Sequence, residues 1–325
     1  MYAHQVIEDI KKTHLSMLNR PGITKNQLRF KDMLNMFINE LTLSQKFHMG
    51  NGDKLYEVCN DEGVPLFEDV QYLKLPYKSI WIDCTMPPPN KNEWYANEFI
   101  EYNNKYHNGE PILNTREGIL CVKLTDTVWL TCTATYVKQK DSWSPGLFPI
   151  IVFIGGVAEY KNREKLREML RTHNIPFNDN LCNGNLLPWP TIDLPEESIL
   201  GMLKEQALNL KLLEHSLKLI NCKNINSEII HPPAALNKKR RKQGKQPIFD
   251  YHVLNVVVPS AKKGYQGKTE PLSHNRVHLC RGHFKEYTEE HPLFGKYTGL
   301  YWWQPHVRGQ NKDGIVMKDY NVTTK

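Results

Sequence analysis

The sequence predicts an α+β protein: a mostly antiparallel sheet with flanking helices, then a long helix followed by a small C-terminal sheet unit. Three observations predict this class. Short runs rich in β-branched and aromatic residues fill the region from Ser79 to Ile154. Helical periodicity precedes and follows that region, and two aromatic-rich runs recur near the C-terminus. We expect two domains, residues 1–188 and residues 189–325.

The first expected element is an amphipathic helix from Lys25 to His48, after the breaker Pro21-Gly22. Its apolar side chains recur at helical spacing, as in a core-facing stripe: Leu28, Met33, Leu34, Phe37, Ile38 and Leu41. Strands follow, bounded by turns that contain Pro, Gly or Asp: Ser79–Cys84, Gly118–Leu124, Val128–Val137 and Phe148–Ile154. The stretch Asn90–Gly109, rich in Asn and Tyr, is expected to leave the sheet.

The next elements are a short charged helix, Tyr160–His173, and a long helix from Pro195 to about Cys222. Proline suits the first helical turn, and the two glutamates after it favour the positive end of the helix dipole. A leucine stripe along the long helix is expected to be buried: Leu203, Leu210, Leu213 and Leu217. The stretch His231–Pro247, HPPAALNKKRRKQGKQP, cannot build a core and predicts a linker or an extended arm.

The C-terminal region predicts the small sheet. Phe249–Pro259 has the composition of a strand, and Ala261–Asn275 that of a loop. The runs VHLCRGHFKEY (Val277–Tyr287) and LYWWQPHV (Leu300–Val307) are expected to pair around a turn at residues 294–299. This region is also chemically unusual, because five of the thirteen histidines lie between His274 and His306 among arginines and aromatic residues.

Composition bounds the class of protein. A chain of 325 residues can bury roughly three quarters of its unfolded surface, so a substantial core is expected. With 40% hydrophobic and 24% charged residues, the chain is expected to fold. The net charge of +7 is partly clustered at residues 238–245, while residues 57–69 are rich in acids. A clustered basic excess favours an acidic partner.

The cysteines indicate the compartment. There are seven, an odd number, and no two are closer than eleven residues apart, which favours free thiols in a reducing environment over a disulfide framework. The longest apolar run, Leu147–Gly156, is too short to span a membrane, and the N-terminal residues have no apolar signal core. We therefore expect a cytoplasmic protein without a membrane partner.

One interpretation of the tail is acid–base catalysis on RNA. A ribonuclease without a metal needs a base for the 2′-hydroxyl, an acid for the leaving oxygen, and a cation beside the phosphorane. The residues that fit these roles are His283, Arg281, His278, Tyr287 and His306. If residues 277–287 form a strand, Arg281 and His283 lie on one face, and His306 or Arg308 would complete the site from the next strand.

A second interpretation is nucleic-acid binding without cleavage. The basic run would neutralise phosphates, tryptophan rings would stack on unpaired bases, and arginines would bind phosphate or a guanine edge. The residues expected to bind RNA are Lys238, Lys239, Arg240, Arg241, Lys242, Lys245, Trp302, Trp303 and Arg308. The structural alternative is that the aromatic residues form cross-strand pairs and that the basic run is solvated surface.

Other chemistry has weaker signals. His278, Cys280 and His283 are spaced too tightly for a zinc knuckle and lack a second pair of ligands, so no metal or other cofactor is expected. Asp83, Glu93 and Asp126 could suggest a carboxylate site, but lone acids at strand ends commonly form turns, and we interpret them so. No phosphate loop, dinucleotide fingerprint or hydrolase motif is present.

The tail also resembles a known family. Its pattern His278, Arg281, Gly282, His283, Phe284 and Tyr287, followed by Trp303, Gln304 and Pro305, is similar to the C-terminal module of a family of proteins carried by bacteriophages and other mobile elements. The family includes a type V-A anti-CRISPR protein that acts on the messenger RNA of the effector nuclease. The phrase Leu236–Pro247 resembles a recurring family segment, and the likeness covers residues 207–320. Cys280 and Phe284 stand where the family pattern would have Arg and Trp.

This resemblance implies a phage or prophage protein that engages RNA, in particular messenger RNA or the translation machinery, in the cytoplasm of a bacterial host. It would interfere with expression of a host gene, such as a defence gene. Two alternatives stay open: the metal-independent ribonuclease described above, and an anti-defence protein that sequesters a host protein through the N-terminal sheet.

Overall fold

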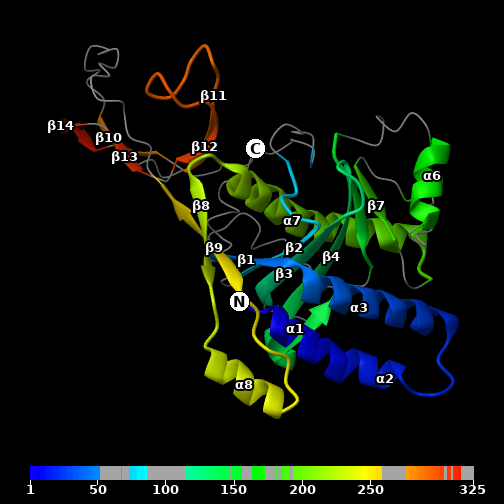
Figure 1. The fold of residues 1–325 in the computed structure, drawn as a ribbon. Coiled ribbons are helices and arrows are strands. Elements are labelled where there is room, and N and C mark those ends of the chain that lie inside the picture. The colour runs from blue at the N-terminus through cyan, green and yellow to red at the C-terminus, as the bar shows by residue number, and fades with distance from the viewer. Residues whose placement is uncertain are drawn as a thin grey trace. The chain divides into compact units, whose positions relative to one another are not determined.

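The computed structural model describes residues 1–51, 67, 73–85, 114–146, 148–155, 163–172, 181, 185–189, 193–257, 276–280, 282–303, 306–308 and 310–315. The chain forms two compact units. The larger unit contains residues 1–218 and 227–254, and the smaller contains residues 219–226 and 255–325. The units therefore do not follow the expected division at residue 188. The predicted α+β class is confirmed, with helices around a mixed, mostly antiparallel sheet (Figure 1).

A nine-stranded sheet forms the centre of the larger unit. Its strand order is β7-β6-β4-β3-β2-β1-β9-β8, with β5 also paired to β4. Neighbours from β7 to β2 are antiparallel, whereas β1 is parallel to both β2 and β9. The strands are β1 (Gln45–Asn51), β2 (Ser79–Thr85), β3 (Asn114–Lys123), β4 (Val128–Val137), β5 (Ser142–Pro145), β6 (Ile150–Phe153), β7 (Leu186–Pro188), β8 (Ile225–Ile230) and β9 (Tyr251–Val256).

The predicted strands of this sheet are confirmed with small changes of boundary. The strand predicted at Val128–Val137 is β4, and the one predicted at Ser79–Cys84 is β2 with Thr85 added. The core of the sheet is built from large side chains that are fully buried, among them Trp81 and Trp129. β3 and β4 form the longest antiparallel pair, and a short 3-10 helix, η3 (Lys138–Lys140), connects β4 to β5.

The N-terminal helices pack against this sheet (Figure 1). They are α1 (Ala3–Asp9), the π-helical turn η1 (Ile10–Leu15), α2 (Ser16–Leu18) and α3 (Lys25–Leu43). A capping box between Thr24 and Gln27 starts α3. The prediction that this helix continues to His48 is wrong, because Ser44 is extended and Gln45 already pairs with Ile80 of β2.

The two later helices were predicted correctly. They are α6 (Arg163–Thr172) and α7 (Glu196–Asn221), and α7 begins directly after Pro195. Its leucine stripe is buried as expected: Leu203, Leu210, Leu213 and Leu217 are at most 1% exposed. Almost all of α7, up to Lys218, belongs to the larger unit. Burial of this stripe supplies most of the helix's stability, since propensity alone contributes little.

The smaller unit contains short strands. β13 (His306–Arg308), β10 (Arg276–Cys280) and β14 (Gln310–Ile315) form one sheet, and β11 (His283–Tyr287) pairs with β12 (Gly299–Trp303). The predicted pairing of the two tail runs is confirmed, because β10 and β11 pair antiparallel with β13 and β12. The predicted turn region contains Phe294 and Gly295, both with positive φ.

Candidate nucleic-acid interface

The basic run lies on a helix. α8 spans Ala234–Lys242 and ends before Gly244, whose φ of +67° is the left-handed conformation that glycine favours after a helix. The prediction of a linker or an extended arm is therefore wrong for residues 234–242. The run has no apolar stripe, so periodicity could not reveal this helix.

Hydrogen bonds from the return segment hold α8 in place. The Asn237 side chain donates to the Ile248 carbonyl at 2.9 Å and accepts from the Ile248 N–H at 2.8 Å. The Arg240 Nε donates to the Gln246 carbonyl at 2.8 Å. Two side chains one turn apart thus bind one face of the helix to residues 246–248, the segment that follows it.

Glu8 connects α8 and the segment after it to α1. One carboxylate oxygen, Oε1, lies 2.8 Å from the Arg240 guanidinium and accepts the Gln246 N–H at 2.7 Å. Charge-assisted bonds of this kind are shorter and stronger than neutral ones. The pair is half-buried, with Arg240 17% and Glu8 32% exposed. Arg240 is therefore engaged within the protein, although it was predicted to bind RNA.

The remaining cations of the run face solvent. At 100° per residue, Asn237 and Arg240 mark the docked face of α8. Lys238, Lys239 and Lys242 lie on the opposite face, and Arg241 lies at the flank, about 40° from Asn237 around the axis. All four are exposed, as is Lys245 beyond Gly244. Like charges on neighbouring turns repel one another, so these cations do not stabilise the helix by themselves. They present a positively charged surface on an ordered element.

The strand register of the smaller unit brings predicted tail residues together along the backbone. His278 lies opposite Arg308, and Cys280 lies opposite His306, in the pair of β10 with β13. His283 lies opposite Trp303 in the pair of β11 with β12. Arg281 lies outside the described residues. The catalytic roles assigned to His278, His283, His306, Arg281 and Tyr287 stay predictions.

The aromatic residues of the β11–β12 hairpin contact one another. Phe284 and Trp302 have ring centroids 4.8 Å apart, and Tyr287 meets Tyr301 edge to face at 5.6 Å. Lys285 lies 5.0 Å from the centre of the Tyr287 ring. The two ring pairs cross between the strands and are of the kind that stabilise a two-stranded ribbon, whereas Lys285 and Tyr287 are neighbours on one face of β11. The rings of Tyr287 and Trp302 thus already have partners.

Asn224 anchors this hairpin inside the smaller unit. Its side chain donates to the Trp302 carbonyl at 2.8 Å and accepts the Trp302 N–H at 2.9 Å. The indole nitrogen of Trp303 is buried and has no hydrogen-bond partner within the described part of the chain. Burial of an unpaired donor is unfavourable, so the position of the Trp303 indole lowers the stability of the folded protein.

Neither a metal cluster nor a membrane helix is found in the described parts of the chain. No group of three His, Cys, Asp or Glu side chains there could hold a metal ion. Of the helices described, none is both long enough and apolar enough to cross a membrane.

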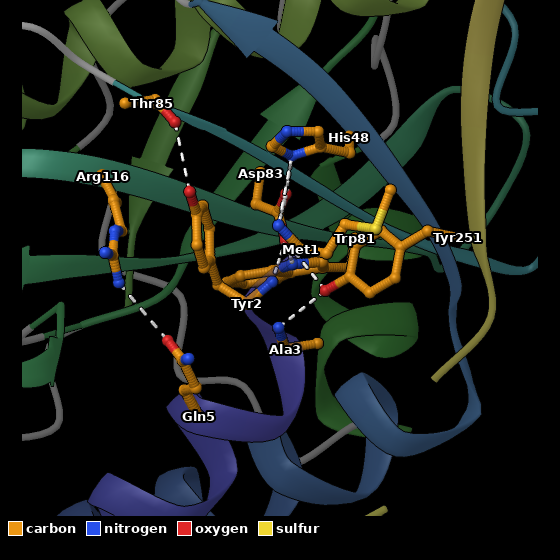
Figure 2. Close-up of polar contacts among 10 residues, drawn as sticks. All are labelled: Met1, Tyr2, Ala3, Gln5, His48, Trp81, Asp83, Thr85, Arg116 and Tyr251. Atoms are coloured by element: carbon orange, nitrogen blue, oxygen red, sulfur yellow. Dashed lines mark hydrogen bonds and ion pairs between the residues drawn. The ribbon is translucent and has the colours of Figure 1, made fainter. Parts of the chain in front are cut away.

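The sequence missed a buried polar centre at Asp83 (Figure 2). This side chain is 0% exposed. Its Oδ2 accepts hydrogen bonds from the Tyr2 N–H at 2.7 Å, the Tyr251 hydroxyl at 2.8 Å and the Trp81 indole at 2.9 Å. Its Oδ1 lies 2.6 Å from the His48 Nδ1. Because an ionised carboxylate only accepts, Nδ1 is the donor in that bond.

The centre secures the start of α1. The first backbone N–H groups of a helix have no partner within the helix and need acceptors elsewhere. Asp83 accepts from Tyr2, and the Tyr251 hydroxyl accepts from the Ala3 N–H at 2.7 Å (Figure 2). Residues 2 and 3 are thereby joined to strands β2 and β9.

Electrostatics favour the ionised form of Asp83. Burial would raise the pKa of this carboxyl, but the His48 hydrogen bond and further interactions outweigh burial and hold the pKa below its usual value of 3.8. Burial and the Asp83 charge raise the pKa of Tyr251, which stays a neutral donor. The interpretation of Asp83 as a turn former is wrong, whereas Asp126, 94% exposed between β3 and β4, does lie in a turn. Glu93 lies outside the described residues.

A second buried acid has a different environment. Glu117 of β3 has one described hydrogen bond, in which the Thr135 hydroxyl donates at 2.8 Å. Burial raises the pKa of Glu117 to about 8. The described residues place no opposite charge beside it. At neutral pH the Glu117 carboxyl is therefore mostly protonated, whereas Asp83 is ionised.

Comparisons with protein-family models, with curated proteins and with solved structures gave no match.

Proposed function

We propose that this protein binds RNA, and that it interferes with expression of a gene of a bacterial host at the level of messenger RNA or translation. The observation that carries the binding part is the exposed face of α8. Lys238, Lys239, Arg241 and Lys242 are exposed on a helix that Asn237 and Arg240 fix in place. Clustered cations on an ordered element are the electrostatic footprint of a nucleic-acid-binding protein.

The resemblance of residues 207–320 to a mobile-element family supports the messenger-RNA part. The place of action would be the cytoplasm of the bacterial host, with the ribosome as one site of contact. The gene that is affected would be identified by experiment.

The test is ultraviolet crosslinking of the tagged full-length protein in a bacterial host, followed by sequencing of the bound RNA. We expect enrichment of particular messengers, and loss of that enrichment when Lys238, Arg241 and Lys242 are all changed to Gln. The matched control changes Lys11, Lys138 and Lys140 to Gln, because these lysines are also exposed and the charge change is the same. Background crosslinking by the unmodified protein would refute RNA binding.

The ribonuclease is a second candidate, favoured by one observation. The β10–β13 register places His278 opposite Arg308 and Cys280 opposite His306, so two histidines and an arginine share one strand pair. We expect purified protein to cleave RNA without added metal, and His278→Ala in this strand pair and His283→Ala in β11 each to abolish cleavage while binding persists. Equal cleavage by the His283→Ala protein would remove the assignment.

A further inference from the structure

We infer that α8 recognises double-stranded, A-form RNA through its phosphate backbone, with no requirement for unpaired bases. This inference rests on the proposed RNA binding and specifies the class of RNA that this face accepts. It is carried by three features of α8: the arc over which its cations are spread, the absence of rings among them, and the rigidity of its attachment.

The cations cover a wide arc of the helix. At 100° per residue, Arg241 and Lys239 lie about 160° apart around the axis, and Lys238 and Lys242 lie between them. Because one side of α8 is held by its own protein, the helix meets a groove from outside, and it then reaches two rows of phosphates only where those rows lie close together. The deep and narrow major groove of an A-form helix meets this condition, whereas the major groove of B-form DNA is wide.

Rings for stacking are missing from this surface. Proteins that bind single strands combine a charged groove with aromatic side chains on which successive bases stack. No aromatic residue occurs from Ala234 to Gln246. The next one, Phe249, has the Lys46 ammonium 4.1 Å from its ring centre. The hairpin rings of the smaller unit pair with each other, as Phe284 does with Trp302.

The attachment of α8 suits recognition of shape. The helix is held by Asn237 on its return segment and by Arg240 on Glu8, so its charges keep fixed relative positions. Double-stranded RNA is recognised mostly by shape and by phosphate and 2′-hydroxyl contacts, for which fixed positions are an advantage. A flexible basic arm would instead follow any polyanion.

The experiment measures binding of the full-length protein to three labelled ligands by fluorescence anisotropy. They are a 20-base-pair RNA duplex, one strand of it designed without self-pairing, and the DNA duplex of the same sequence. The α8 triple variant carries Lys238→Gln, Arg241→Gln and Lys242→Gln, and the control variant carries Lys11→Gln, Lys138→Gln and Lys140→Gln. Circular dichroism checks that both are folded.

We expect the RNA duplex to bind at least tenfold more tightly than either other ligand. The dependence of log affinity on log salt should become shallower by about 2 to 3 in the α8 triple variant, because each lost phosphate contact removes about 0.9. The control variant should keep the wild-type slope. A further variant with Lys238→Arg and Lys242→Arg, which keeps the charge, should keep duplex binding.

Two outcomes would overturn this inference while leaving RNA binding in place. One is equal or tighter binding of the single strand or of the DNA duplex. The other is an α8 triple variant that binds the RNA duplex as the control variant does. If the wild-type protein binds neither form of RNA, the proposed function itself fails.

Discussion

Removing the Asp83 carboxylate should strongly destabilise the larger unit. In Asp83→Ala, four donors lose their acceptor: the Tyr2 N–H, the Trp81 indole, the Tyr251 hydroxyl and the His48 Nδ1. Each buried donor left unpaired costs about 1–3 kcal/mol. A change of the His48 tautomer can relieve one of them, so we expect a loss of at least about 3 kcal/mol, a large share of an ordinary domain's stability.

A graded series separates the charge from the shape. Asp83→Asn keeps an oxygen for the three donors at Oδ2 and can offer its amide to His48 in the other tautomer. It should therefore cost only the charge assistance of these bonds, about 1–2 kcal/mol. Asp126→Ala is the matched control, because that acid is 94% exposed in a turn, and it should change stability by less than about 0.5 kcal/mol.

The assay is urea unfolding followed by tryptophan fluorescence, with hydrogen exchange of residues 2–9 measured by mass spectrometry. The exchange of α1 should accelerate in Asp83→Ala more than that of β4. Since the pKa of Asp83 is lowered on folding, the stabilisation is complete above 3.8 and is lost as the pH falls through the lower native value. A cost below about 1 kcal/mol for Asp83→Ala at neutral pH would refute the role of this centre.

Three further predictions concern other parts of the larger unit. Burial raises the pKa of Glu117 to about 8, so this carboxyl should contribute a loss of stability to the wild-type protein as the pH rises from 4.5 to about 8. Thermal melts of Glu117→Gln across that range should lack this loss, and parallel curves for the two proteins would contradict it. A Cβ at Gly118 would lie 2.1 Å from the Trp81 ring, so Gly118→Ala should cost about 1–3 kcal/mol or more in urea unfolding, and an unchanged midpoint would show that the ring can move. Arg240→Gln removes the bond to Glu8 and should cost about 1–2 kcal/mol, whereas the α8 triple variant should stay within about 0.5 kcal/mol of wild type; the reverse order in the same assay would contradict the assignment of the docked face.

The sequence predicted those elements whose stability depends on local pattern. β4 and β2 were found because β-branched and aromatic residues run without interruption between turns. α7 was found because a proline start and a leucine stripe are both visible in the chain. The end of α3 was missed, because no proline or glycine between Lys25 and Met49 marks it in the sequence, while pairing with β2 draws Gln45 into a strand.

The two polar arrangements could not be predicted in the same way. Asp83 takes its donors from residues 2, 48, 81 and 251, so its environment depends on contacts across most of the chain. The only local signal was its place inside SIWIDC, a strand buried along its whole length rather than at one face. α8 depends likewise on Glu8, more than two hundred residues away in the sequence.

The charged groups of α8 and of the Asp83 centre lie in opposite environments. Around Asp83 several donors share one carboxylate. This carboxylate is fully buried, and it accepts a hydrogen bond from Tyr2 at the start of α1. Within the described part of the chain, Arg240 is the one cation of α8 with an ion pair to an acid, and the neighbouring cations are exposed. Like charges that do not stabilise their own helix are expected where an external polyanion binds them and neutralises their charge. We therefore expect the proposed RNA binding to depend on the exposed cations of α8, whereas the Asp83 centre maintains the fold.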